Sequence, residues 1–372
     1  MKSKQPLYPR ISTVGLALSL LMGGGCTVEA SGQSFIGPFS SVTTVGTTVP
    51  TNGDVNPYGV AQVPSSKGKL VEGQFLVSNF NNSSNLQGTG TTIVEISAGG
   101  AFSQFAQLNA SNVTCPGGIG LTTALVALRS GFVIVGSLPT TDGTSATIGS
   151  GCLIVLDSWG NVVETLWGHG INGPWDMTAV DGGDISALFV TNVLNGTLAA
   201  DGSQVNRGTV VRLYLSTFEG RRPEILQSTI IASGFPERTD PAALVIGPTG
   251  VAFDLESGIL YVADSLDNRI AAVPNALFRF DSANRGETVS QGGALNDPLG
   301  LALTPNHHLV EANGDDGNIV EINPKSGKQV AVKLVDNSGG PPPGSGALFG
   351  LLAVPGGVYF VDDASNSLEL LN

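Results

Sequence analysis

The chain has 372 residues, and its 30 acidic against 17 basic residues give a formal charge of −13. This charge excludes binding to a phosphate backbone, which needs clustered Lys and Arg, so we expect no nucleic acid partner. Charged residues make up only 13 %, and 51 Gly and 21 Pro accompany an apolar share of 41 %. This composition excludes coiled coils and helical solenoids and favours short strands joined by many turns.

The first 25 residues resemble an export signal, because a basic start precedes an apolar run at 11–22 that is too short to span a bilayer. Two cleavage sites remain open. Residues 23–26 are similar to a bacterial lipoprotein box, in which Cys26 is lipidated, and the alternative is a cut after Ala30. Both predict export to the periplasm, the extracellular space or a lipid-anchored place on the cell envelope. A membrane is expected as a partner only through this anchor.

A turn-plus-strand phrase recurs six times after residue 51, with its clearest copies at 247–252 and 297–302. A tight turn and a second strand ending in a small polar residue follow each copy. A third strand comes next, as at 319–322, and a fourth is visible at 329–334. Six repeats of four strands predict an all-β, six-bladed β-propeller of four-stranded antiparallel blades over residues 51–372.

The last repeat lacks one strand, because the chain stops after its third strand at 367–371. Residues 41–45, within an N-terminal segment at 26–50, have the composition of a strand. We expect this N-terminal strand to complete the last blade and close the ring, which removes an exposed sheet edge.

Two phrases resemble NHL repeats, namely Pro-x-Gly-Val-Ala at 248–252 and Tyr-Val-Ala-Asp-Ser-x-x-Asn-Arg-Ile at 261–270. The resemblance covers about residues 56–371. Similar propellers include binding modules, gluconolactonase-like and strictosidine-synthase-like hydrolases, the virginiamycin B lyase group and peptide-amidating lyases. The resemblance therefore implies a fold more than an activity.

One face of the predicted ring carries the loops that enter each blade and the loops between second and third strands. Long insertions at 80–92, 138–152 and 193–208 fall on this face in blades 1 to 3 and predict a binding rim. The ends of the second strands predict a ring of polar groups at the channel mouth, formed by Asn79, Ser137, Asn192, Asp264, Asn313 and Asp363. Such a ring can hold waters, a cation or a polar ligand. The alternative is that these side chains bond turn amides.

Cysteine and histidine supply the remaining candidates. Cys115 and Cys152 form an even pair in an oxidising compartment, and we expect a disulfide worth about 4 kcal/mol in the chain-entropy model. Two separately buried thiols are the alternative. His169, in the loop entering blade 3, is the candidate acid/base residue, with a surface histidine as the alternative. His307 and His308 fall in a turn of the opposite face, where we expect both to point to solvent.

Two functions remain open. The first is a monomeric, non-enzymatic module that binds an unknown small molecule or protein through the insertion-bearing face. The second is a hydrolase or lyase similar to gluconolactonase-like propellers, whose resemblance implies a divalent cation such as Ca²⁺ at the axis. Its ligands would be Asp264, Asp363 and Asn192, although this sequence lacks the Glu with which that pattern begins.

Overall fold

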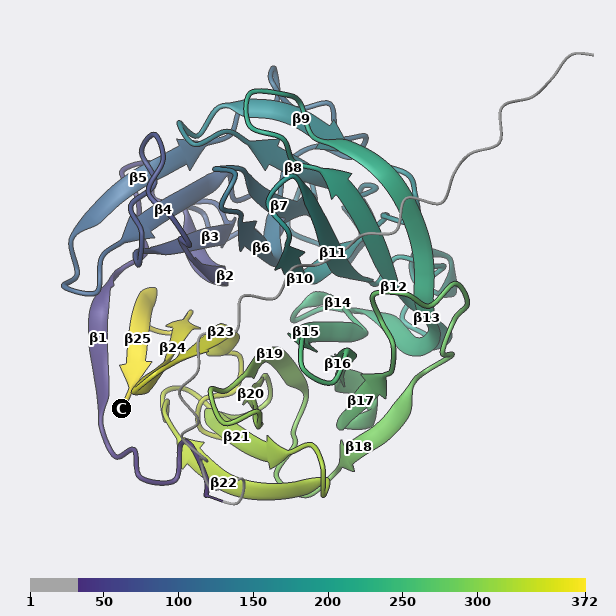
Figure 1. Cartoon of the computed structure of the whole chain (residues 1–372). Coiled ribbons are helices and arrows are strands. Elements are labelled where there is room, and N and C mark those ends of the chain that lie inside the picture. Colours follow the sequence, from purple (N-terminus) through teal and green to yellow (C-terminus); the bar gives the residue numbers. More distant parts are fainter. Residues whose placement is uncertain (1–32) are drawn as a thin grey trace, which may run out of the picture. The chain divides into compact units, whose positions relative to one another are not determined.

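The computed structural model describes residues 33–372, of which Ser34–Asn372 form one compact unit. This unit is a ring of six antiparallel sheets, each a blade that runs from an inner to an outer strand (Figure 1). The predicted all-β, six-bladed propeller is therefore confirmed. The export signal and Cys26 lie outside the described residues.

The blades follow one another along the chain. Blade 1 comprises β2 (Val55–Gln62), β3 (Phe75–Asn81), β4 (Thr92–Ile96) and β5 (Phe102–Gln107). Blade 2 comprises β6 (Leu121–Ala127), β7 (Val133–Ser137), β8 (Cys152–Leu156) and β9 (Val162–Leu166). Blade 3 comprises β10 (Pro174–Asp181), β11 (Ile185–Asn192), β12 (Val205–Ser216), β13 (Glu224–Asp240) and β14 (Leu244–Ile246).

The second half of the ring is more regular. Blade 4 comprises β15 (Pro248–Asp254), β16 (Ile259–Asp264), β17 (Arg269–Val273) and β18 (Glu287–Gln291). Blade 5 comprises β19 (Pro298–Leu303), β20 (Leu309–Asn313), β21 (Asn318–Asn323) and β22 (Lys328–Leu334). Blade 6 comprises β23 (Leu348–Val354), β24 (Gly357–Asp362), β25 (Ser367–Leu371) and, as its outer strand, β1 (Val42–Thr47).

The N-terminal strand closes the ring as predicted. β1 pairs antiparallel with β25, and Val42 lies opposite Leu371 (purple beside yellow in Figure 1). The segment before β1 is fastened to blade 5, where Lys333 Nζ donates to Gly37 O at 2.9 Å and to Phe39 O at 2.6 Å. Blade 6 thus contains both the first and the last strand of the described chain.

Blade 3 departs from the predicted four strands. Its β12 and β13 are 12 and 17 residues long, and the end of β13 turns back to pair with β14. Arg238 there lies opposite Ile246. The segment that enters blade 4 is therefore a fifth strand, which its Pro-containing sequence at 236–246 concealed.

The core lies between the blades. The third strands β4, β8 and β17 are buried along their whole length, because neighbouring blades cover both faces of each sheet. The outer strand β22 alternates between exposed and half-buried residues instead. Sheet-to-sheet packing around the ring therefore supplies the apolar burial.

Candidate binding face and axial channel

The long insertions lie where the sequence predicts them. Loops of 10, 14 and 12 residues join the second and third strands of blades 1 to 3, at 82–91, 138–151 and 193–204. The corresponding loops of blades 4 to 6 have four residues each. Long loops therefore cover one half of this face, whereas the other half carries only short turns.

The insertions are bonded to one another. Gln87 Nε2 in blade 1 donates to Ala242 O in the β13–β14 hairpin at 2.6 Å. Thr140 N in blade 2 donates to Gly88 O at 2.8 Å. Asn195 N in blade 3 donates to Glu237 Oε1 at 2.9 Å. We call this assembly, residues 82–91, 138–151, 193–204 and 236–246, the insertion platform.

The predicted disulfide is present and stabilises the platform. It joins Cys115, in the loop that enters blade 2, to Cys152, the first residue of β8, with their Cα atoms 5.6 Å apart. Such bridges are typical of oxidising compartments outside the cytoplasm. Within residues 33–372, no helix combines the length and apolar character needed to cross a bilayer.

Beneath the platform, apolar side chains close the axis of the ring. Tyr58, Trp175, Leu299 and Phe349 come from four inner strands and are all buried. The ring centroid of Tyr58 lies 4.0 Å from that of Phe349 and 6.3 Å from that of Trp175. Platform residues Leu138, Val193 and Leu244 belong to the same cluster, and so does Phe80 of β3. We call these eight side chains the axial plug.

Four members of the predicted polar ring bond the backbone of the segment that leads into their own blade. The bonds run from Asn79 Nδ2 to Thr48 O, from Gly120 N to Ser137 Oγ, from Asn172 N to Asn192 Oδ1 and from Asn296 N to Asn313 Oδ1, at 2.9, 3.0, 3.1 and 2.9 Å. The four side chains are fully buried. Their placement matches the turn-bonding alternative, and a ligand-binding role for the ring stays a prediction.

Asp264 of the ring is held by two arginines. Its Oδ2 accepts bonds from Arg269 Nη2 at 2.8 Å and Arg285 Nη2 at 2.7 Å. Burial raises the pKa of Asp264, and the bonds from the two guanidinium groups oppose that rise. A carboxylate with two cationic partners offers little negative charge to a metal ion.

In blade 6 the ring position belongs to Asp362. Leu348 lies opposite Asp362, as Pro298 lies opposite Asn313 in blade 5. The sequence assignment of Asp363 to this position is therefore one residue off, because two adjacent aspartates end the strand. Burial raises the pKa of Asp363 to about 6, and the charge of Asp362 adds to the rise.

The candidate metal ligands do not fit a shared divalent cation. Asn192, Asp264 and Asp363 belong to three blades, and the first two already bond protein groups. Among residues 33–372, no group of three or more His, Cys, Asp or Glu side chains is arranged to hold a metal ion. The divalent cation stays a prediction.

His169 lies away from the axis. It is exposed in the loop between β9 and β10, beside a cavity of about 510 Å³ that Trp167 and Ile225 also line. Trp167 is 57 % exposed, whereas Trp175 is buried in the axial plug. The structure therefore separates side chains that are close in sequence, and an acid/base role for His169 stays a prediction.

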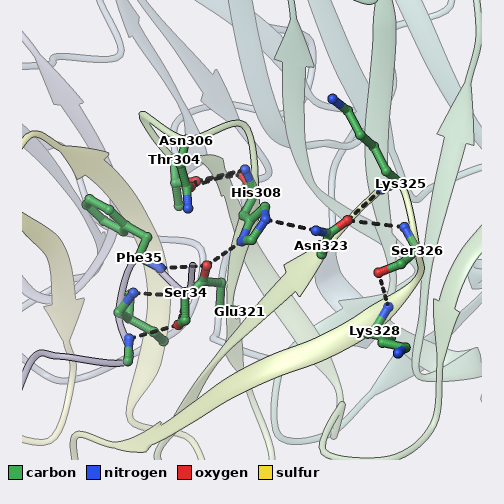
Figure 2. Close-up of polar contacts among 12 residues, drawn as sticks. Ser34, Phe35, Thr304, Asn306, His308, Glu321, Asn323, Lys325, Ser326 and Lys328 are labelled. Atoms are coloured by element: carbon green, nitrogen blue, oxygen red, sulfur yellow. Dashed lines mark hydrogen bonds and ion pairs between the residues drawn. The ribbon is translucent and has the colours of Figure 1, made fainter. Parts of the chain in front are cut away.

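The expectation that both other histidines face solvent is wrong for His308. His307 is 46 % exposed in its side chain, but His308 is only 3 % exposed. Its Nδ1 lies 2.5 Å from Glu321 Oε1, and its Nε2 lies 3.0 Å from Asn323 Nδ2 (Figure 2). A buried carboxylate on the adjacent strand β21 draws the imidazole inward.

The same glutamate binds the N-terminal segment. Glu321 accepts hydrogen bonds from Ser34 Oγ at 2.6 Å and from the amides of Phe35 and Ile36, both at 2.8 Å (Figure 2). A catalytic serine would bond the histidine that takes its proton. Ser34 bonds the carboxylate instead, so this Ser-His-Glu cluster fastens the N-terminal segment to blade 5.

A cavity of about 260 Å³ lies along the inner strands, and Asp176 of β10 is the ionisable residue in its lining. Asp176 was not among the predicted site residues. A signal was present, because the equivalent residue of the other blades is Gly or Ala.

Comparisons with known proteins agree on the fold. No protein-family model matches the chain, and no curated protein matches it in sequence. A gluconolactonase from Xanthomonas campestris is similar with a TM-score of 0.53 and 12 % identity, over 89 % of this chain and 88 % of that one. The PQQ-bound aldose sugar dehydrogenase of Streptomyces coelicolor is similar with a TM-score of 0.52 and 16 % identity, over 89 % of this chain and 97 % of that one.

A virginiamycin B lyase from Staphylococcus aureus gives a TM-score of 0.48 and 12 % identity, over 88 % of this chain and 84 % of that one. The structural neighbours therefore include the gluconolactonase-like and virginiamycin B lyase-like propellers expected from the sequence. At these identities the likeness shows the fold alone.

Proposed function

We propose that this protein is an exported binding module that engages another macromolecule, most simply a protein, through the insertion platform. The observation that carries the proposal is the bonding of four separate insertions into one surface on one half of one face. Loops that only connect strands need no such bonding. A pre-ordered surface loses little conformational entropy when it binds a partner.

The axial plug decides the kind of partner. Because apolar side chains fill the axis beneath the platform, recognition at this face uses a surface rather than a deep pocket. Exposed apolar residues are present on that surface, with Leu86 at 37 % and Leu198 at 45 % exposure. Interfaces that form and dissociate are about as apolar as the rest of a protein surface, so a polar surface with a few exposed apolar side chains is compatible with such an interface.

Site-specific photo-crosslinking in the producing cells tests this proposal. A photoreactive amino acid is placed at Leu86 or Leu198 of the full chain, with Ile185 on the opposite face and Val332 on the outer edge of blade 5 as controls of similar exposure. We expect the two platform positions to yield the same adduct and the controls to yield none of it. Excess unlabelled protein should compete the adduct away. Equal adducts from all four positions, or none, would contradict the proposal.

Metal analysis distinguishes the module from the lactonase-like alternative. We expect no stoichiometric divalent ion in the purified protein and no change of Tm with EDTA, since the candidate ligands do not fit a shared cation. A bound ion whose removal lowers Tm would favour the hydrolase instead.

A further inference from the structure

Blade 3 breaks a pattern that the other inner strands share. Register along the blades makes Asp176 equivalent to Gly250, Gly300 and Gly350, because Met177, Val251, Leu301 and Leu351 occupy matching pairs with the second strands. Blades 1 and 2 carry Gly59 and Ala124 at this level. Blade 3 therefore has an acidic side chain at a position where the other five blades have glycine or alanine.

The glycines are needed where neighbouring inner strands touch. A Cβ atom on Gly300 would lie 2.2 Å from Phe349 O, and one on Gly350 would lie 2.3 Å from Tyr58 O. Between blades 3 and 4 there is room for a side chain, and Asp176 Oδ2 accepts a bond from Val251 N at 3.0 Å. Asparagine would provide the same acceptor, so the ring does not require a carboxylate here.

Asp176 also contributes to the axial cavity of about 260 Å³ and remains 8 % exposed. The other lining residues are uncharged, chiefly Val, Leu, Ala and Gly with Thr123 and Thr178. A volume of this size holds about nine waters, or a ligand with a similar number of non-hydrogen atoms.

The cavity opens away from the insertion platform. It shares Val126, Thr178 and Phe253 with a second cavity of about 520 Å³, which reaches Arg129 and Leu255 in the turns of the opposite face. The axial plug closes the other end. A ligand therefore enters from the turn face and meets Asp176 deep inside.

The electrostatics favour a cation at this point. Among residues 33–372, no Lys, Arg or His side chain forms an ion pair with Asp176. Burial raises the pKa of Asp176 to about 7, and bonds from the amides of Met177 and Val251 oppose the rise. A desolvated carboxylate without a counter-charge gains most from a cationic ligand.

We propose that the axial cavity binds a small molecule with an apolar body and a protonated amine, whose ammonium group pairs with Asp176. The apolar body lies along Met177, Val251 and Leu301, and the ligand is a single short chain or ring. This site is separate from the insertion platform, so it does not depend on the proposed macromolecular partner.

Three four-carbon probes of similar size test the site on the purified chain: butylamine, butanol and butyrate. Binding is measured by isothermal calorimetry, and NMR of methionine methyl groups reports contact with Met177. We expect saturable binding of butylamine, weaker binding of butanol and none of butyrate. Asp176→Asn keeps the bond to Val251 N and should weaken butylamine binding at least about tenfold.

Two further variants keep the test decisive. Thr178→Phe should block the passage shared by both cavities and abolish binding while leaving Asp176 in place. Glu287→Gln, exposed on the outer strand β18, is the matched control and should bind as the unsubstituted protein does. Equal binding of butylamine and butanol, retention of binding in Asp176→Asn or Thr178→Phe, or no saturable binding of butylamine would each overturn the proposal.

Discussion

Blades 4 and 5 each bury a carboxylate on their second strand, but the two carboxylates differ in their hydrogen-bond and ion-pair partners. In blade 4, Asp264 accepts bonds from Arg269 and Arg285, so its charge is compensated inside the protein. In blade 5, Glu311 is fully buried, and neither carboxylate oxygen has a hydrogen-bond partner within the described chain. Burial alone therefore does not determine whether an acidic group in this ring is charged, because its hydrogen-bond and ion-pair partners also affect its pKa.

The environment of Glu311 is that of an apolar residue. The equivalent positions of the other blades carry Val77, Val135, Val190, Val262 and Phe360. Burial raises the pKa of Glu311 well above its usual value, and the charges of Asp316 and Asp297 raise it further. Burial and the neighbouring charges therefore favour the protonated form of Glu311, whereas Asp264 belongs to an ion cluster with two arginines.

The largest effect is expected from breaking the ion cluster of blade 4. Asp264→Ala leaves Arg269, which is itself buried, without its carboxylate partner. We expect the free energy of unfolding to fall by about 3–5 kcal/mol, because removing one partner of a buried pair strands the other charge. Urea unfolding monitored by tryptophan fluorescence measures this. Asp142→Ala, on the exposed surface, serves as control, and a loss no larger than the control's would show that Asp264 is not structural.

In blade 5 we expect a substitution to raise the free energy of unfolding instead of lowering it. Glu311→Met places an apolar side chain of similar length among the apolar neighbours and should raise the free energy of unfolding by about 1–3 kcal/mol at neutral pH. Glu95→Met is the matched control, since Glu95 accepts a bond from Val71 N at 2.8 Å and its loss should destabilise. Destabilisation by both substitutions would mean that Glu311 has a partner or a ligand.

The gain from Glu311→Met should depend on pH. The folded protein holds the Glu311 proton more tightly than the unfolded chain, whose pKa is near 4.5. Above that pH the unfolded state binds fewer protons, so the protein loses stability as pH rises toward the folded pKa. The difference between variant and unsubstituted protein should grow by at most about 1.4 kcal/mol per pH unit from pH 4.5 upward. Unfolding curves at a series of pH values check this, and a constant difference would contradict it.

Local sequence patterns were enough for the fold and insufficient for the site. Strand ends such as Asp264 and Asn313 were predictable because neighbouring strands of a blade are also neighbours in sequence. The closing strand was predictable because the last repeat lacks a strand, although Val42 and its partner Leu371 are far apart in sequence. The disulfide was predictable because two cysteines form an even pair. The axial plug was not, because Tyr58, Trp175 and Phe349 come from three repeats and meet only when the ring closes. His308 was misplaced because the pairing of β20 with β21 brings the Glu321 carboxylate beside its imidazole, and the position of His308 in a turn did not reveal this contact.

The smallest change in the free energy of unfolding is expected around Glu321. This third buried carboxylate is surrounded by hydrogen-bond donors. Ser34 Oγ is one of four donors to its oxygens, with His308 and the amides of Phe35 and Ile36. Ser34→Ala removes one half-buried donor and leaves three, so we expect a loss of only about 1 kcal/mol. Hydrogen exchange should show faster opening of the amides of Phe35 and Ile36 while strand β20 remains protected.

A loss spread evenly over blade 5 would indicate that Ser34 stabilises the whole blade. Retained protection of both amides would indicate that Glu321 holds the segment without the hydroxyl. Ser326→Ala, on an exposed turn of the same blade, is the matched control. A carboxylate that accepts bonds from several donors should tolerate the loss of one, because the remaining donors still bond it. The stabilisation of Asp264 rests on two charged partners instead, and among residues 33–372 Glu311 has no hydrogen-bond donor to lose.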